Sequence, residues 1–129
     1  MSIKLYHHTS YEGVNGILTD GKIRQTEVGG KDAVFGKGVY LTSYGPDKSE
    51  EEVAENNFDA AAAAMLAEGK GDIILKVKVS KHNVTKAKSE RDIYIHSGDI
   101  PKDRIKAMYR RNKKRKAVKC KIKIQKQKE

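Results

Sequence analysis

Two adjacent histidines are the first residues of this chain whose types and spacing could do chemistry. His7 and His8 stand at the end of a strand-like segment and are followed by Thr9. Neighbouring side chains of a strand point to opposite faces, so the two imidazoles cannot bind one metal ion together. The chain has a single cysteine, Cys120, and we expect no metal site. One histidine of the pair would therefore face a cleft, unless both are ordinary strand-end residues.

A glycine-rich segment, residues 35–42 (FGKGVYLT), is the second such feature. Gly36 and Gly38 would let the backbone approach another chain segment or a ligand closely. Tyr40 follows on the strand that this segment enters. The segment is not the dinucleotide-binding fingerprint, because Leu41 stands where that motif needs a third glycine. Taken alone, it predicts a turn with a strand behind it.

Strands are the more numerous of the elements that must position these residues. Hydrophobic patterns predict them at residues 3–8, 23–24, 39–42, 72–80, 93–96 and within 100–109, with a small extension at 84–85. The expected helices fall in the first half of the chain. A length of 129 residues is typical of one domain. We therefore expect a single compact domain of the α+β class.

Two helices are expected, each opened by a capping box, in which a Ser or Thr is followed three residues later by Glu. The pairs are Thr9 with Glu12 and Ser49 with Glu52, and the helices would end at Gly21 and near Glu68. The inward-facing stripe of the second helix would consist of Val53, Phe58, Ala61, Ala62, Met65 and Leu66.

Positive charge is concentrated at the end of the chain. The formal net charge is +10, and residues 102–129 alone hold fourteen Lys and Arg against two acids. We therefore expect a near-neutral domain at residues 1–109 and a basic segment at residues 110–129. The densest part could contact a polyanion through Arg110, Arg111, Lys113, Lys114, Arg115 and Lys116. A solvated segment that only aids solubility is the alternative.

The basic segment is expected to end in a strand at residues 117–124, because apolar residues and lysines alternate there with a period of two. Val118, Cys120, Ile122 and Ile124 would face the core. Cys120 would then be a buried strand residue and not a nucleophile.

The longest apolar run, residues 60–66, is far shorter than the roughly 20 residues of a membrane span. No charged and then apolar leader opens the sequence. We expect an intracellular protein, cytoplasmic or nuclear, with no membrane partner.

Three segments in this order resemble the diphtheria-toxin-like ADP-ribosyltransferases: residues 5–9 (LYHHT), 16–24 (GILTDGKIR) and 35–42. This superfamily has a His-Tyr-Glu triad and includes the catalytic domains of poly(ADP-ribose) polymerases and small toxin-type domains. The resemblance covers about residues 3–43. It implies a split β-sheet fold that binds NAD in a central cleft. The implied activity is that of an NAD-dependent mono-ADP-ribosyltransferase, which releases nicotinamide and modifies a macromolecular acceptor, either a protein or a nucleic acid.

Carried over by position, the resemblance implies roles for residues of the first half. His7 matches the triad histidine, which hydrogen-bonds the adenine-side ribose, and the backbone of His8 would hold the nicotinamide amide. Tyr40 matches the triad tyrosine, whose ring stacks on nicotinamide. Thr9 matches the threonine of the motif, and Arg24 lies where the family often contacts adenosine or diphosphate. The implied NAD-binding set is His7, His8, Thr9, Arg24, Gly38, Tyr40 and Ser49.

The third catalytic position, a glutamate in the family, falls within residues 90–96 (ERDIYIH). Asp92 is the residue that we align there, so the implied catalytic set is His7, Tyr40 and Asp92. Glu90, on the same strand face two residues earlier, is an alternative. Ile93 is another, and in the family an apolar residue there accompanies single-unit transfer or loss of activity. Synthesis of long chains is not expected.

Two further family positions have more than one candidate. The serine that binds the nicotinamide amide could be Ser43 or Ser49. A second stacking ring could be Tyr44 or Phe58.

Two other functions fit the same resemblance. A non-catalytic module of this fold would bind NAD, ADP-ribose or nucleic acid without turnover. An RNA 2′-phosphotransferase-like enzyme would also consume NAD, and the basic tail mildly favours it.

Overall fold

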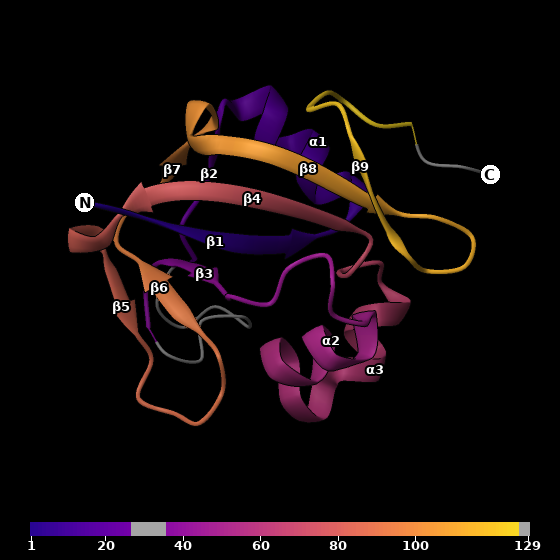
Figure 1. The fold of residues 1–129 in the computed structure, drawn as a ribbon, viewed down its shortest axis with the longest axis horizontal. Coiled ribbons are helices and arrows are strands. Elements are labelled where there is room, and N and C mark those ends of the chain that lie inside the picture. Colours follow the sequence, from indigo (N-terminus) through magenta and orange to yellow (C-terminus); the bar gives the residue numbers. More distant parts are fainter. Residues whose placement is uncertain (27–35, 127–129) are drawn as a thin grey trace.

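The structure is a computed structural model that describes residues 1–26 and 36–126 of the chain. Helices and antiparallel sheets in these residues confirm the α+β class (Figure 1). The helices are α1 (Tyr11–Asp20), α2 (Glu50–Phe58) and α3 (Ala62–Ala67), with short 3-10 helices η1 (Asp59–Ala61), η2 (Lys81–Asn83) and η3 (Lys102–Arg104). The strands are β1 (Ser2–Thr9), β2 (Lys22–Ile23), β3 (Val39–Leu41), β4 (Ile73–Ser80), β5 (Val84–Lys86), β6 (Tyr94–His96), β7 (Ile100–Pro101), β8 (Ile105–Arg111) and β9 (Ala117–Cys120).

The main sheet consists of four antiparallel strands in the order β1-β4-β8-β9. Side chains alternate between its two faces. One face carries Leu5, Leu75, Val77 and Met108, which are buried and pack in one cluster with Val14 of α1. Helix α1 therefore covers this face, and the core of the domain lies between them.

A second sheet, in the order β3-β6-β5, and the pair β2-β7 complete the β-structure. The second sheet meets the main sheet at one bridge between Tyr6 of β1 and Thr42, whose backbones exchange hydrogen bonds of 2.8 and 3.0 Å. The β-structure is thus split as the family resemblance implies. This junction places Tyr40 of β3 beside His7 of β1.

The helix boundaries follow local signals, with one correction. Helix α1 is capped by Ser10 and not by Thr9, because the Ser10 hydroxyl accepts from Gly13 N at 3.0 Å. Gly21 ends the helix in the left-handed conformation, with φ of 79°. The capping box of Ser49 and Glu52 at the start of α2 is present as predicted.

The second predicted helix is interrupted, so a single helix to Glu68 is wrong. Helix α2 ends at Phe58, and Asp59 has φ of 49°, outside the helical range. The Arg91 guanidinium donates to the carbonyls of Asn56 and Asn57, both at 2.7 Å. These carbonyls are thereby satisfied outside the helix, and the chain turns into η1 and α3.

The predicted C-terminal strand is shorter and less buried than expected. Strand β9 ends at Cys120, and Val118, Ile122 and Ile124 are 48%, 40% and 54% exposed, which contradicts their expected core positions. Val118 lies opposite Arg110 at the edge of the sheet, where no apolar layer continues. Cys120 is half-buried, in line with a packing role and not a reactive one, and burial raises the pKa of its thiol.

The basic segment is joined to the rest of the domain. Strand β8 continues through residues 109–110, and the end of the described chain is attached to α1. There the Asn15 side chain and the Gln125 backbone exchange two hydrogen bonds of 2.8 Å. Within the described residues, no helix is long and apolar enough to cross a membrane.

Candidate active site

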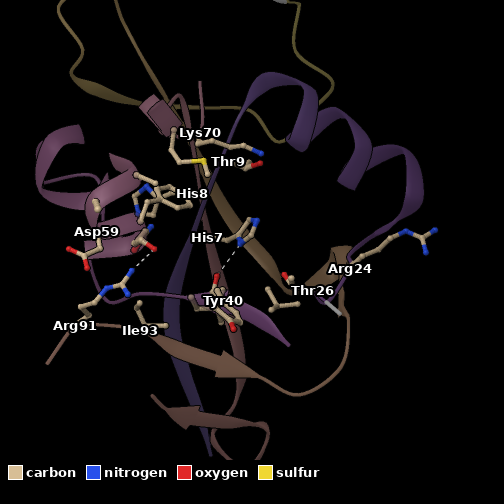
Figure 2. A pocket seen from close by; sticks show the side chains of 17 residues that line it. His7, His8, Thr9, Arg24, Thr26, Tyr40, Asp59, Lys70, Arg91 and Ile93 are labelled. Atoms are coloured by element: carbon tan, nitrogen blue, oxygen red, sulfur yellow. Dashed lines mark hydrogen bonds between the residues drawn. The ribbon is translucent and has the colours of Figure 1, made fainter. Parts of the chain in front are cut away.

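A cavity of about 510 Å³ lies between the end of β1, strand β3 and the α2–α3 region. His7 and Tyr40 contribute to its wall from the two strands, and Phe58 from the end of α2. Figure 2 shows Asp59 and Arg91 on the side of the helices, across the cavity from Arg24. A cavity of this size is typical of small-molecule sites.

His7 is held against Tyr40 and is neutral at pH 7. Its Nδ1 lies 3.2 Å from the Tyr40 carbonyl oxygen (Figure 2). A carbonyl only accepts, so Nδ1 donates and Nε2 remains an acceptor. Burial lowers the pKa of His7, and the positive charge of Lys70 lowers it further. The ring can therefore accept a hydrogen bond from a ligand hydroxyl.

His8 connects β1 to the loop after β3. Its Nε2 lies 2.7 Å from the Tyr44 carbonyl oxygen and donates to it. The ring is 8% exposed, and its Nδ1 has no hydrogen-bond partner in the described part of the chain. Burial lowers its pKa to about 4, so His8 is also neutral at pH 7.

Tyr40 lines the cavity, whereas Gly38 does not. The Tyr40 hydroxyl donates to the Gly36 carbonyl at 2.7 Å, which fixes the ring. A Cβ at Gly38 would lie 2.4 Å from Ile95 Cγ2 and 2.8 Å from the His96 carbonyl oxygen. Gly38 therefore allows the close approach of another chain segment, β6, and contributes no cavity wall.

The structure brings Asp92 close to the end of β3 but not into the cavity wall. Its carboxylate accepts from Thr42 Oγ1 at 2.9 Å, from Ser43 N at 2.7 Å and from the Ser43 hydroxyl. Ile93, the next residue, lines the cavity instead. Glu90 is exposed and is not part of the wall.

The other expected contacts are divided between the cavity and its surroundings. Thr9 and Arg24 line the cavity, and Arg24 Nε forms an ion pair of 2.9 Å with Asp20 Oδ2. Ser49 caps α2 outside the cavity, and Ser43 is bonded to Asp92. Neither serine lines the wall.

Of the two candidate second rings, Phe58 lines the cavity and Tyr44 does not. Lys70, Asp59 and Arg91 also line the cavity, and sequence reasoning missed them. The only nearby sequence signal was Gly69, a helix-ending glycine that directly precedes Lys70 and has a left-handed conformation in the structure.

A second cavity, of about 480 Å³, adjoins the first along α1 and β2. The two share four lining residues: His7, Thr9, Arg24 and Lys70. Two of the four are cations, of which Arg24 is paired with Asp20, and Glu12, Asp20 and Glu68 also line the second cavity. No cluster of three or more His, Cys, Asp or Glu that could hold a metal occurs in residues 1–26 and 36–126.

Comparison with known proteins agrees with this arrangement. A family model described as a HYD1-signature-containing ADP-ribosyltransferase matches residues 5–104. No curated protein and no solved structure gives a significant match. The matched range includes β3, β6, the part of β1 from Leu5 onward and every residue that lines the two cavities. The chain therefore belongs to the family of ADP-ribosyltransferases that contain the HYD1 signature.

Proposed function

We propose that this protein is an NAD-dependent mono-ADP-ribosyltransferase that modifies a macromolecular acceptor. The observation that carries the proposal is the pair of adjoining cavities with His7, Thr9, Arg24 and Lys70 at their boundary. A dinucleotide has two nucleoside halves joined by an anionic diphosphate, and this arrangement offers two adjoining spaces with the cations Arg24 and Lys70 at their boundary. Family membership supports ADP-ribose transfer in general.

The first cavity has the surfaces that the nicotinamide half needs. The ring of Tyr40 and the side chains of Phe58 and Ile93 form apolar walls for a flat aromatic group. Neutral His7 offers Nε2 to a ribose hydroxyl. Arg24 and Lys70 would contact the diphosphate at the boundary.

The reaction proceeds by cleavage of the bond between ribose C1 and the nicotinamide nitrogen, whose electron pair leaves with nicotinamide. The acceptor nucleophile then bonds to C1 and loses a proton. The ribose carries developing positive charge between these events, so a carboxylate nearby stabilises it. Holding the ribose and the leaving ring in fixed positions lowers the barrier further.

We assign the carboxylate to Asp92, which lies just before β6, the strand beside Tyr40. Thr42 and Ser43 would have to release the carboxylate for it to reach the ribose. Asp92 is adjacent to Ile93 of the cavity wall, and its backbone is held to the Asn56 side chain by two hydrogen bonds of 2.7 Å, so the movement we propose is a rotation of the carboxylate.

One observation favours a second candidate, a module that binds NAD without turnover. Ile93, and not an acid, lines the cavity at the third catalytic position, and Asp92 is bonded elsewhere. An apolar wall cannot stabilise positive charge on ribose. If Asp92 stays on Ser43 when NAD is bound, binding would occur without cleavage.

Release of free nicotinamide from NAD, measured alongside NAD affinity, tests the proposal. We expect wild-type release to fall about 100-fold or more in His7→Ala and Asp92→Asn, the scale of a missing catalytic group. Asp92→Asn keeps one oxygen that can accept from Thr42 and Ser43 N. Glu90→Gln is the matched control and should release nicotinamide like the wild type. NAD binding without release would support the non-catalytic module, and absence of both would overturn the proposal.

A further inference from the structure

The charged side chains of the main sheet are all positive, although its strands come from distant parts of the sequence. Strands β1, β4, β8 and β9 contain no Asp or Glu. Their cations are Lys4, Lys76, Lys78, Lys106, Arg110, Arg111 and Lys119. The acids of the described chain therefore lie in the helices and in the segments that connect the elements.

Three of these cations lie exposed on the sheet face that α1 does not cover. Leu5 and Val77 face α1, so the residues next to them along each strand point to the opposite face of the sheet. Lys4 pairs directly with Lys78, and Lys119 lies across from Tyr109. Like charges placed opposite one another destabilise a sheet, which indicates that an anionic partner would be favoured here. We call this surface the outer face (Figure 1).

Two tyrosines lie between these lysines on the outer face. Tyr6 pairs with Lys76 of β4, and Tyr109 pairs with Ile74 and Lys119, so the two rings flank the same central strand. Both are half-buried. Burial raises the pKa of Tyr6, and the nearby Tyr109 and Asp47 raise it further. Gly45 packs against the Tyr6 ring, so this ring presents only part of its aromatic surface beside the cations.

The β8–β9 turn extends the outer face, although with fewer available cations than the sequence predicted. Arg111 is 6% exposed and donates to the carbonyls of Gly71 and Arg115, so it cannot reach a partner. Arg115 is paired with Glu50 and Asp72. Arg111 is therefore not available for the expected polyanion contact, and Arg115 would have to exchange its ion pairs for one. Exposed Lys113, Lys114 and Lys116 remain at this end of the sheet.

We infer that the outer face binds single-stranded nucleic acid. Lysines spaced along flat strands suit the phosphates of an extended chain, and tyrosine rings suit unstacked bases. An acidic protein would use the lysines but would gain little from the two rings. A duplex keeps its bases stacked and would likewise use the lysines alone. This binding does not depend on NAD turnover, so it stands or falls separately from the proposed function.

The lysines are tested by the salt dependence of binding to a fluorescein-labelled oligothymidylate. The slope of log K against log salt is negative. Each lysine–phosphate pair that a variant removes should reduce the magnitude of this slope by about 0.7 for a single strand. We expect the double variant Lys78→Gln with Lys119→Gln to reduce the magnitude of the slope by about 1.4. The control pair, Lys88→Gln with Lys102→Gln, has the same net charge but lies off the main sheet and should leave the slope unchanged. Equal effects of both pairs would overturn the proposal.

The tyrosines are tested with Tyr109→Leu and Tyr109→Phe. Stacking predicts about a tenfold loss of oligonucleotide affinity in Tyr109→Leu, since each stacked base contributes about 1–3 kcal/mol. Tyr109→Phe keeps the ring and should bind like the wild type. Inorganic polyphosphate, which has no bases, should bind both variants equally. Tighter binding of duplex DNA or of polyglutamate than of the single strand would also contradict the inference.

Discussion

At the scale of single residues, the two adjacent histidines of β1 illustrate how position changes chemistry. His7 donates to Tyr40 and keeps an acceptor for a ligand, whereas His8 joins β1 to Tyr44. Both are neutral because burial disfavours the imidazolium. Both residues line the cavity; His7 offers an acceptor to a ligand there, and His8 also supports the loop that follows β3.

The lowered pKa of His8 predicts acid sensitivity. Its folded pKa is about 4, below the usual 6.5, so the unfolded chain binds the proton first as the pH falls. Stability is present above about pH 6.5 and is lost progressively toward pH 4, by about 3 kcal/mol in total. His8→Gln keeps a donor for Tyr44 but cannot titrate. Urea unfolding at pH 7 and pH 4 should show a smaller difference for the variant, and an unchanged difference would contradict the assignment.

Alanine substitutions at Gly38 and at Gly16 should change the free energy of unfolding in opposite directions. Gly38 has φ of 150° and no room for a Cβ against β6, so Gly38→Ala should lower the free energy of unfolding by about 2–3 kcal/mol. Gly16 lies inside α1 with nothing within 4 Å of an added Cβ. Gly16→Ala should therefore raise the free energy of unfolding by up to about 1 kcal/mol. Denaturant titration measures both, and equal signs would refute this.

At the scale of elements, the break between α2 and α3 forms one side of the cavity. Arg91 donates hydrogen bonds to the carbonyls of Asn56 and Asn57, and the chain turns at Asp59. Asp59 and Phe58 both line the cavity. A continuous helix would direct these side chains elsewhere, so the interruption is what builds the wall.

The strained turn predicts that Asp59→Gly is tolerated or stabilising. Asp59 has φ of 49° and ψ of −120°, a combination that glycine adopts readily. Relief of about 1–3 kcal/mol of strain is partly offset by the greater freedom of glycine in the unfolded chain. We expect a net gain of about 1 kcal/mol in urea unfolding, with no gain for Asp59→Ala. A clear loss in the glycine variant would show that the carboxylate itself stabilises the turn.

At the scale of the whole molecule, charge is divided between the parts. The main sheet has cations as its only charged side chains, and the first turn of α2 has Glu50, Glu51 and Glu52. Arg115 connects the two regions through Glu50 and Asp72. This connection holds the β8–β9 turn against the helical side of the domain.

Removal of that connection should loosen β9 before the rest of the fold. Arg115→Ala leaves Glu50 and Asp72 without their ion pairs, and we expect a decrease of about 1–2 kcal/mol in stability that shrinks at high salt. Amide hydrogen exchange should speed up in β9 more than in β4. Arg115→Lys keeps the charge but not the bidentate geometry and should recover part of the decrease. Replacement of exposed Lys114 by alanine is the control and should have no effect.

Much of the arrangement could be predicted where the signals are local. The strands around His7 and Tyr40, the cap at Ser49 and the end of α1 at Gly21 follow from short-range patterns. The break at Asp59 could not be predicted, because the carbonyls just before it are bound by Arg91, more than thirty residues away. The burial of Arg111 was hidden in the same way, since its carbonyl partner is at Gly71.

The sequence by itself determined the family, the α+β class and the types of residue at the site, because these depend on local order and spacing. Only the tertiary structure decided that Ile93 and not Asp92 faces the cavity, and that Tyr6 and Tyr109 flank one strand. The physical reason is that side-chain direction and strand neighbours are set by hydrogen bonds between distant segments. Hydrogen bonds between distant residues, such as that between Ser43 and Asp92, produce no repeating pattern in the sequence from which they could be predicted.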